Sequence, residues 1–136
     1  MLILVLNCGS SSIKGDIVHH TSGERVSSLR VQRIGKLDGA SIILNGMESA
    51  LGKAGASHET ALTFALPKLL GTLPEGARIE GVGHRVVHGG QDFVAALRID
   101  DEVEAAIEGL VPLAPLHNSI NLLGIRNSRK LLPDIP

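Results

Sequence analysis

The sequence has 136 residues, a length that suits one domain with a core of its own. Hydrophobic residues make up 43% of it and charged residues 20%, which is typical of a soluble globular protein and excludes intrinsic disorder. The net charge is −1 and aromatic residues are scarce, so neither nucleic acid nor a membrane surface is expected as a partner.

A single cysteine, Cys8, excludes a disulfide scaffold and favours a reducing compartment. The first apolar run, Met1 to Leu6, is too short to span a membrane and lacks the basic lead-in of a signal peptide. We therefore expect a cytoplasmic protein.

The first third of the chain predicts strands. The aliphatic run Leu2 to Leu6 is typical of a strand buried on both faces. Two further strands are predicted over Ile13 to Val18 and Arg25 to Ile34, and the short turn after Asn7 makes the first two antiparallel. The glycine-rich stretch that follows predicts a loop with one strand near Ser41 to Leu44.

Helices alternate with a strand in the rest of the chain. Leucines at helical spacing indicate an amphipathic helix over His58 to Leu70, capped by Ser57, and Ile79 to His88 predicts a strand. Two later helices, with the residues that could cap them, are expected over Glu102 to Leu110 (Asp100 or Asp101) and Ile120 to Leu132 (Asn118 or Ser119). Pro112 and Pro115 predict an extended loop between these helices. This order predicts an α/β fold, a mixed sheet with helices packed on it.

A serine-rich turn, Gly9 to Ser12, follows the first strand. Gly9 allows a tight turn, and the N–H groups and hydroxyls around it can form an anion-binding concavity. Lys14 adds a positive charge, and Asn7 offers an amide suited to a hydrated metal or a phosphate oxygen. The alternative is a hairpin turn that only satisfies its own backbone. The turn is not a Walker A loop, because the G-x-x-x-x-G-K-[ST] pattern is absent.

Arg85 and Val87 share one face of the predicted strand from Ile79 to His88, flanked by Gly83 and Gly89. A guanidinium beside branched methyl groups, with open space above the glycines, suits a small carboxylate with a short alkyl tail. Arginine binds a carboxylate or a phosphate through two parallel hydrogen bonds. The alternative is an ion pair that holds two elements together.

His84 and His88 lie on the opposite face of this predicted strand. Their Cα atoms would be roughly 13 Å apart, which is too far for them to share one zinc ion. We therefore expect a structural role for each histidine and reject a metal site built from the pair.

Two prolines stiffen the segment Pro112 to Asn118. They would hold Leu116 and His117 in fixed directions just before a helix N-terminus, which favours anions. The near-neutral titration of imidazole makes His117 a candidate catalytic residue, with a capping or packing role as the alternative.

Together the three clusters resemble the acetate kinase family. The motifs that carry the resemblance are Asn7-x-Gly9-Ser10-Ser11-Ser12-Ile13-Lys14, Gly83-His84-Arg85-Val86-Val87-His88-Gly89-Gly90 followed by Phe93, and Ala114-Pro115-Leu116-His117-Asn118 followed by Asn121-Leu122-Leu123-Gly124-Ile125. The resemblance implies an actin-like ATPase (ribonuclease H-like) fold, in which two similar domains close on a nucleotide. Residues 1–136 would be the N-terminal domain, with its first three strands antiparallel, and the second, nucleotide-binding domain would be absent.

The resemblance also implies an activity, the reversible transfer of the ATP γ-phosphoryl group to acetate, which gives acetyl phosphate and ADP and requires Mg²⁺ or Mn²⁺. It further implies a homodimeric parent enzyme. The site residues it implies are Asn7, Ser10, Ser12 and Lys14 near the transferring phosphate, with Asn7 toward the metal; Arg85 on the carboxylate and the phosphoryl group; Val87 and Leu116 along the alkyl end; and His117 close to the phosphoryl group. Positioning and charge neutralisation dominate such a transfer.

The sequence departs from the family pattern in four places. Cys8 replaces a common alanine, which we expect to be harmless. Gly15 replaces an aromatic residue, which is expected to loosen the second strand, and Ser119 replaces a proline and is expected to cap the last helix instead. The strand with a catalytic aspartate that follows Leu131 to Pro136 in the family is absent here, so we expect the chain alone to be inactive. Propionate or butyrate kinase, a non-catalytic anion-binding module and a structural remnant are the alternatives.

Overall fold

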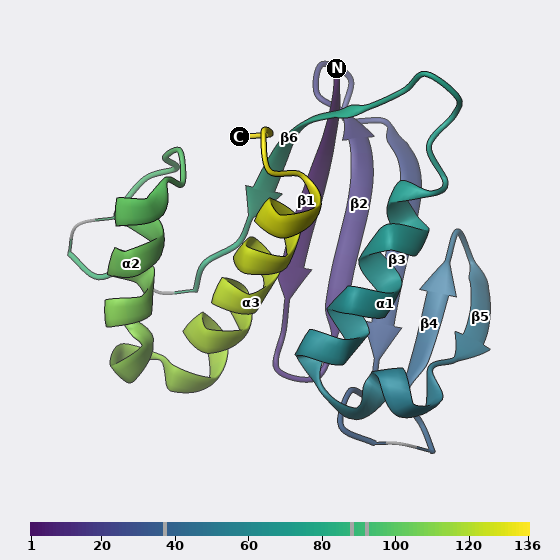
Figure 1. The fold of residues 1–136 in the computed structure, drawn as a ribbon, viewed down its shortest axis with the longest axis horizontal. Coiled ribbons are helices and arrows are strands. Elements are labelled where there is room, and N and C mark those ends of the chain that lie inside the picture. The colour runs from purple at the N-terminus through teal and green to yellow at the C-terminus, as the bar shows by residue number, and fades with distance from the viewer. Residues whose placement is uncertain (37, 88, 92) are drawn as a thin grey trace.

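A mixed sheet with helices packed on one of its faces makes up the fold (Figure 1). The structure is a computed structural model that describes residues 1–36, 38–87, 89–91 and 93–136. In these ranges the sheet has the strand order β5-β4-β3-β2-β1-β6, in which β1 and β6 are parallel and all other neighbours are antiparallel. The strands are β1 (Leu2–Cys8), β2 (Ile13–His19), β3 (Arg25–Gln32), β4 (Ser41–Leu44), β5 (Met47–Ala50) and β6 (Ile79–His84). The predicted mixed sheet with three antiparallel strands at its start is confirmed.

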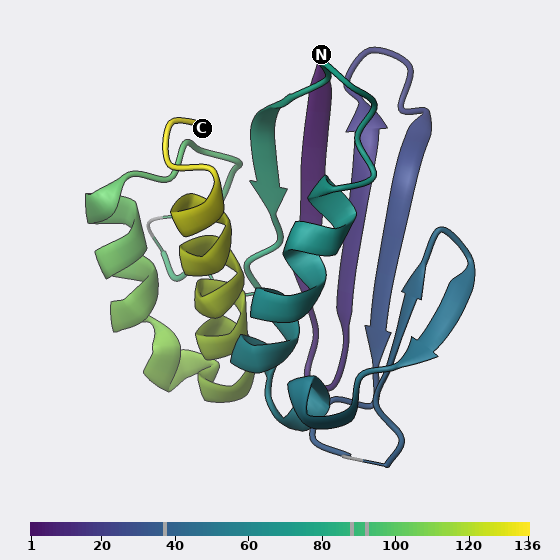
Figure 2. The same ribbon diagram turned by 45° about the vertical axis from the view of Figure 1, so that its right-hand side comes forward.

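Two helices cover one face of the sheet, and a third packs on the outside of them. The helices are α1 (His58–Leu70), α2 (Asp101–Gly109) and α3 (Pro115–Leu131), with short 3₁₀ turns η1 (Gly52–Ala56) and η2 (Val111–Leu113). Figures 1 and 2 show α1 and α3 lying side by side against the sheet, with α2 beyond α3. None of the helices in the described ranges is long and apolar enough to cross a membrane.

The first strand is buried on one face only, not on both as its continuous aliphatic run predicts. Its even-numbered residues lie beneath the helices and are buried: Leu2, Leu4, Leu6 and Cys8. Val5 points to the opposite face and is 43% exposed. The run is apolar on both sides, but helices cover only one side in the described part of the chain, so burial follows the alternation of the strand. Below, this uncovered side is called the open face of the sheet.

Helix α1 begins and ends where the sequence predicts. Ser57 accepts a hydrogen bond from the Thr60 N–H, and the Thr60 hydroxyl in turn accepts one from the Ser57 N–H, which forms a capping box. Leu62, Leu66 and Leu69 are buried against the sheet. Each such leucine contributes about 1.5–3 kcal/mol of burial free energy, so this helix anchors the core under β2 and β3.

Several predicted elements have different bounds in the structure. Strand β6 ends at His84 rather than at residue 88, and α3 begins at Pro115 with Ala114 as its cap, so neither Asn118 nor Ser119 caps it. The segment between the prolines is a 3₁₀ turn and a helix start rather than an extended loop. Pro115 occupies the first helical position, where its fixed φ favours the helix and its missing N–H costs nothing.

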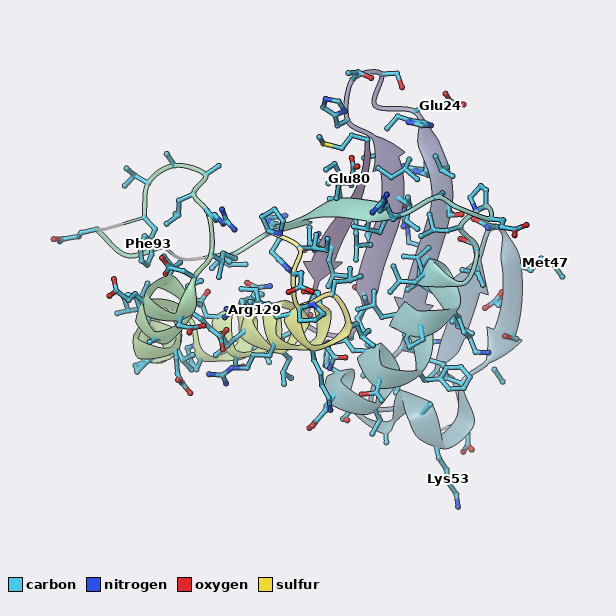
Figure 3. All side chains as sticks on the ribbon, turned by 45° about the horizontal axis from the view of Figure 1, so that its top comes forward. Glu24, Met47, Lys53, Glu80, Phe93 and Arg129 are labelled. Carbon is cyan, nitrogen blue, oxygen red and sulfur yellow. The ribbon has the colours of Figure 1, made fainter. Side chains whose placement is uncertain are left out.

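Strand β5 is absent from the sequence predictions. All four of its residues are exposed, so its pattern has no apolar alternation, and Figure 3 shows Met47 pointing away from the molecule. It pairs with β4 through the turn Asn45–Gly46, in which both residues have positive φ (49° and 83°). The Asn-Gly dipeptide is itself a strong hairpin signal that would have revealed the strand.

Gly15 lies within β2, which stays paired on both sides at this position. It pairs with Leu6 on one side and Leu29 on the other, without a shift of register at that point. A Cβ on Gly15 would approach Leu69 Cδ2 to 3.0 Å. The missing side chain therefore allows α1 to pack closely on the strand.

Candidate functional site

The serine-rich turn joins β1 to β2 and is held from three sides. The Gly9 N–H donates to the Ser12 carbonyl at 2.8 Å, and the Ser11 carbonyl accepts from the Ile34 N–H at 3.0 Å. His58, the first residue of α1, places its Nε2 2.7 Å from the Gly9 carbonyl oxygen. This contact of His58 joins residues 49 positions apart, so no local sequence pattern predicts it. The Ser10 side chain lies exposed at the tip of the turn.

Asn7 and Lys14 are direct neighbours at the base of this turn, paired across β1 and β2. The flanking residues Leu6, Cys8 and Ile13 are buried under the helices. Because side chains alternate along a strand, Asn7 and Lys14 point to the open face of the sheet. Asn7 is half-buried there and Lys14 is exposed.

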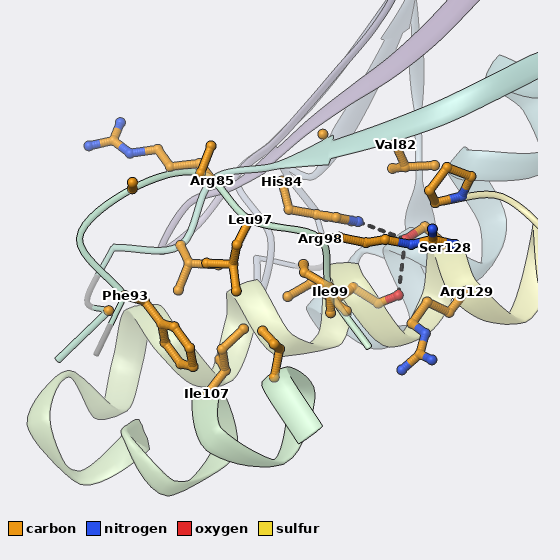
Figure 4. A pocket seen from close by; sticks show the side chains of 18 of the residues that line it. Val82, His84, Arg85, Phe93, Leu97, Arg98, Ile99, Ile107, Ser128 and Arg129 are labelled. Carbon is orange, nitrogen blue, oxygen red and sulfur yellow. Dashed lines mark hydrogen bonds between the residues drawn. The ribbon is translucent and has the colours of Figure 1, made fainter. Parts of the chain in front are cut away.

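Arg85 and Val87 lie beyond the end of β6, so the prediction that they share one face of a strand is wrong. The pairing of β6 with β1 ends at Leu6 and His84, after which the Arg85 N–H donates to the Leu6 carbonyl at 3.3 Å. Arg85 therefore follows His84 on the opposite side of the sheet, and Figure 4 shows the two side chains pointing apart. Leu6 and His84 are paired, Asn7 follows Leu6, and Arg85 follows His84. Because side chains alternate along a strand, Arg85 lies on the open face, as Asn7 does.

The Arg85 guanidinium forms no ion pair with any residue that the structure describes. The alternative role as a structural ion pair therefore has no support among these residues. The predicted open space exists above Gly83, where a Cβ would meet nothing within 4 Å. It does not exist at Gly89, where a Cβ would lie 2.1 Å from the Phe93 carbonyl oxygen.

Leu116 and His117 lie in the first turn of α3, not in front of it. Both side chains are exposed. Ser119, the expected cap, instead donates its hydroxyl hydrogen bond back to the Pro115 carbonyl inside the helix. His117 thus sits beside the free N–H groups of a helix start, where the helix dipole favours an anion.

An asparagine of α3 joins the end of β1 to the segment after β6. It is not among the site residues predicted from the sequence. The Asn121 side chain donates to the Cys8 carbonyl at 3.0 Å and accepts from the Val87 N–H at 3.0 Å. It lies one helical turn after His117, on the same side of the helix. The base of the serine turn, the segment after β6 and the start of α3 therefore meet at one amide.

The eight predicted site residues lie on the three segments that meet at Asn121. Within the described ranges, no hydrogen bond or ion pair joins their side chains to one another. The residues are Asn7, Ser10, Ser12, Lys14, Arg85, Val87, Leu116 and His117. Asn7, Lys14 and Arg85 share the open face, whereas Leu116 and His117 come from the helix layer. The two cationic side chains on the open face, Lys14 and Arg85, suit an anion with several oxygens.

Few of the described residues in this region suit a divalent cation. The described residues include no group of three His, Cys, Asp or Glu side chains that could hold a metal. Asp16, the nearest acidic residue along β2, is paired with Arg25 at 3.3 Å and Arg30 at 2.9 Å. Mg²⁺ usually keeps several waters and takes substrate phosphate oxygens as ligands, so the Asn7 amide could serve as one ligand of such an ion.

A large apolar cavity lies elsewhere, on the helix side of β6 (Figure 4). Its volume is about 710 Å³, and residues of β6, α2, α3 and the segments 93–99 and 132–136 line it, among them Phe93, Ile99, Ile107 and Ile125. Of the predicted site residues only Arg85 borders it, and its side chain points away. The cavity is therefore distinct from the open face that carries Asn7, Lys14 and Arg85.

His84 has a structural partner in the wall of this cavity. Its Nε2 lies 3.0 Å from the Ser128 hydroxyl oxygen (Figure 4). Burial lowers the pKa of His84 to about 4, because the charged imidazolium is poorly solvated there. The imidazole is thus neutral at pH 7. The predicted role of His88 falls on a residue outside the described ranges.

Comparison with known proteins gives a consistent result. Residues 2–136 match the Acetokinase family. The whole chain is 40% identical to acetate kinase from Clostridium botulinum (strain Loch Maree / Type A3), of which it covers 36%. The structure is similar to the crystal structure of Porphyromonas gingivalis acetate kinase, with a TM-score of 0.82 at 38% identity over 98% of this chain and 35% of that one.

A propionate kinase is also similar in structure. The enzyme from Francisella tularensis subsp. tularensis gives a TM-score of 0.85 at 29% identity, over 99% of this chain and 35% of that one. The chain therefore spans about a third of the length of the relatives it matches.

Proposed function

Because this chain belongs to the Acetokinase family, we propose that it forms the carboxylate-binding and phosphate-binding part of an acetate kinase. The complete enzyme would transfer the γ-phosphoryl group of ATP reversibly to acetate, which yields acetyl phosphate and ADP. The observation that carries this proposal is the Arg85 guanidinium, which is exposed on the open face and has no ion-pair partner among the described residues. Residues 1–136 would be the incomplete N-terminal domain of that enzyme.

Arg85 would act first as a clamp for the carboxylate. Two parallel N–H···O bonds orient acetate, so that one oxygen faces the γ-phosphorus in line with the leaving ADP oxygen. As the phosphoryl group transfers, negative charge spreads over its equatorial oxygens. The same guanidinium, Lys14 and His117 would stabilise that charge.

The serine turn would hold the phosphate chain. The Ser10 and Ser12 hydroxyls and the N–H groups of the turn are donors, and Gly9 leaves the backbone free to approach the oxygens. Bound Mg²⁺ or Mn²⁺ would neutralise phosphate charge, with Asn7 as one protein ligand. The turn is already fixed by His58 and Ile34, so little ordering is needed when a ligand arrives.

Acetate is the substrate we propose, on the strength of the acetate kinases that the chain resembles at 38–40% identity. Val87 and Leu116 would line the alkyl end of the substrate, and both are about half exposed, at 47% and 56%. One methylene changes binding by only about 1–3 kcal/mol. Propionate kinase is the second candidate, because the similar Francisella tularensis structure carries that name.

A chimeric enzyme tests the proposed function. Residues 1–136 would replace the matching 36% of the Clostridium botulinum acetate kinase, and acyl phosphate would be measured as its hydroxamate with acetate, propionate and butyrate. We expect turnover by the chimera, highest with acetate, and none by the 136-residue chain alone. An inactive but folded chimera would contradict the proposal.

The same assay distinguishes the proposed kinase from a non-catalytic anion-binding module. An anion-binding module would bind acetate or phosphate at millimolar concentration, seen as shifted amide signals of Ser10 to Ser12, yet would give no active chimera. We further propose that the parent enzyme is cytoplasmic and homodimeric. Sedimentation of the chimera would check the dimer.

A further inference from the structure

The proposed reaction does not require Asn121 to contact the ligand. Its side chain is 2% exposed, between α3 and the end of β1. The amide NH₂ donates to the Cys8 carbonyl and the amide oxygen accepts from the Val87 N–H, each at 3.0 Å. A buried amide that satisfies both partners is stabilising, whereas the loss of one leaves an unpaired polar group at a cost of about 1–3 kcal/mol.

The two partners of Asn121 belong to the two halves of the anion site. Cys8 follows Asn7 directly and opens the serine turn, and Val87 lies two residues after Arg85. Beyond the Arg85 N–H, the backbone after β6 has left its partner strand. The Val86 side chain packs against the cluster of Ile107, Leu122 and Ile125, and the hydrogen bond from Val87 to Asn121 then holds the backbone itself.

The helix that carries Asn121 comes unusually close to β1. At Gly124, three residues further on, a Cβ would lie 2.8 Å from Cys8 Sγ and 3.3 Å from Leu6 Cδ2. With any larger residue here, the Cys8 side chain or one of the two elements would have to shift. A short side chain such as asparagine can therefore span the distance from α3 to both backbones.

We infer that Asn121 is a positioning residue, which sets the spacing between Arg85 and the serine turn without contacting the ligand. This inference rests on the proposed function, because that function defines what is positioned. An amide is suited to the role, because it donates and accepts at the same time without carrying charge. A displacement of about 1 Å at a site of this kind can cost about 10²-fold in rate.

Amide hydrogen exchange of the 136-residue chain tests the positioning directly and needs no activity. In Asn121→Ala we expect the Val87 amide to exchange at least about tenfold faster, since its acceptor is lost, while amides in the middle of β1 and β2 stay protected. Asn127→Ala is the matched control, an asparagine of the same helix with no hydrogen bond to the site among the described residues. Unchanged exchange at Val87 would overturn the inference.

A second variant guards against simple loss of packing. Asn121→Asp keeps the shape and still offers an oxygen that accepts from the Val87 N–H, but its carboxylate cannot donate to the Cys8 carbonyl. We therefore expect Asn121→Asp to keep most of the Val87 protection that Asn121→Ala loses. Equal loss of Val87 protection in the two variants would count against the inference.

Kinetics of the chimera provide the last readout. Asn121→Ala should lower kcat and raise the KM for acetate together, about 10²-fold in kcat/KM, and Asn127→Ala should change neither. Normal kinetics of the Asn121→Ala chimera would overturn the inference. If the chimera with Asn121 intact is inactive, the proposed function fails, and the exchange experiment still decides the role of Asn121.

Discussion

His84 and Arg85 are adjacent in the chain but lie in opposite environments. His84 faces the helix layer, bonded to Ser128 in the wall of an apolar cavity, and burial keeps its imidazole neutral. Arg85 faces the open side, exposed and without an ion-pair partner among the described residues. One step along the backbone thus separates a neutral group that supports the fold from a charged group free to bind a ligand. The difference arises from which face the helices cover.

The largest expected effect comes from removing the charge on the open face. Arg85→Ala in the chimera should lower turnover at least about 10³-fold, by analogy with arginines that stabilise transferring phosphoryl groups. Arg85→Lys should restore only part of it, because lysine lacks the planar fork. The control is Arg78→Ala, an exposed arginine just before β6, which should keep full activity. Near-normal turnover of Arg85→Ala would rule out the role given to it.

On the helix side, the expected effect is a pH dependence of the free energy of unfolding, caused by His84. The pKa of His84 falls from 6.5 to about 4 on folding, so its neutral form contributes stability above pH 6.5, and that stability is lost as the pH drops toward 4. We expect a loss of about 1–3 kcal/mol in the free energy of unfolding over this range. Urea unfolding at several pH values measures it. His84→Gln should show a shallower decline, and equal slopes for both proteins would contradict the assignment.

Packing on the helix side should tolerate little added volume. Gly124→Ala places a Cβ 2.8 Å from Cys8 Sγ, so the Cys8 side chain, α3 or β1 must shift, at a cost of about 1–3 kcal/mol. Gly109→Ala is the control at the end of α2, where a Cβ would meet nothing within 4 Å. Thermal unfolding compares the two, and the idea fails if Gly124→Ala is as stable as the parent.

The smallest effect is expected at the outer wall of the cavity. The Asp100 carboxylate accepts from the Val103 N–H at 2.8 Å and caps α2. Asp100→Ala should lower stability by about 1 kcal/mol, measured by thermal unfolding, and should leave ligand binding on the open face unchanged. Weaker phosphate binding in this variant would show that the two sides are coupled.

Local patterns predicted the parts of the fold that local forces determine. The leucine spacing and Ser57 located α1, because a helix and its cap depend on residues close in sequence. The aliphatic run located β1 but not its exposed face, since no sequence pattern shows where a helix will pack. The end of β6 depends on how far β1 can pair with it, and the start of α3 on Pro115 acting as a first helical residue.

The candidate site was predictable by residue type but not by arrangement. The motifs identified Asn7, Lys14 and Arg85, whose chemistry suits an anion. The register between β1 and β2 places Asn7 beside Lys14, and the pairing of β1 with β6 places Arg85 on the same face. Asn121 was missed because its two partners are 113 and 34 residues away.

The close approach of α3 to β1 has one practical consequence. Cys8 is the only thiol of the chain, it is buried beneath Gly124, and burial raises its pKa to about 12. A thiol without thiolate character resists alkylation as long as the helix stays docked. The rate at which iodoacetamide alkylates Cys8 therefore measures how often α3 lifts from the sheet, and no engineered cysteine is needed.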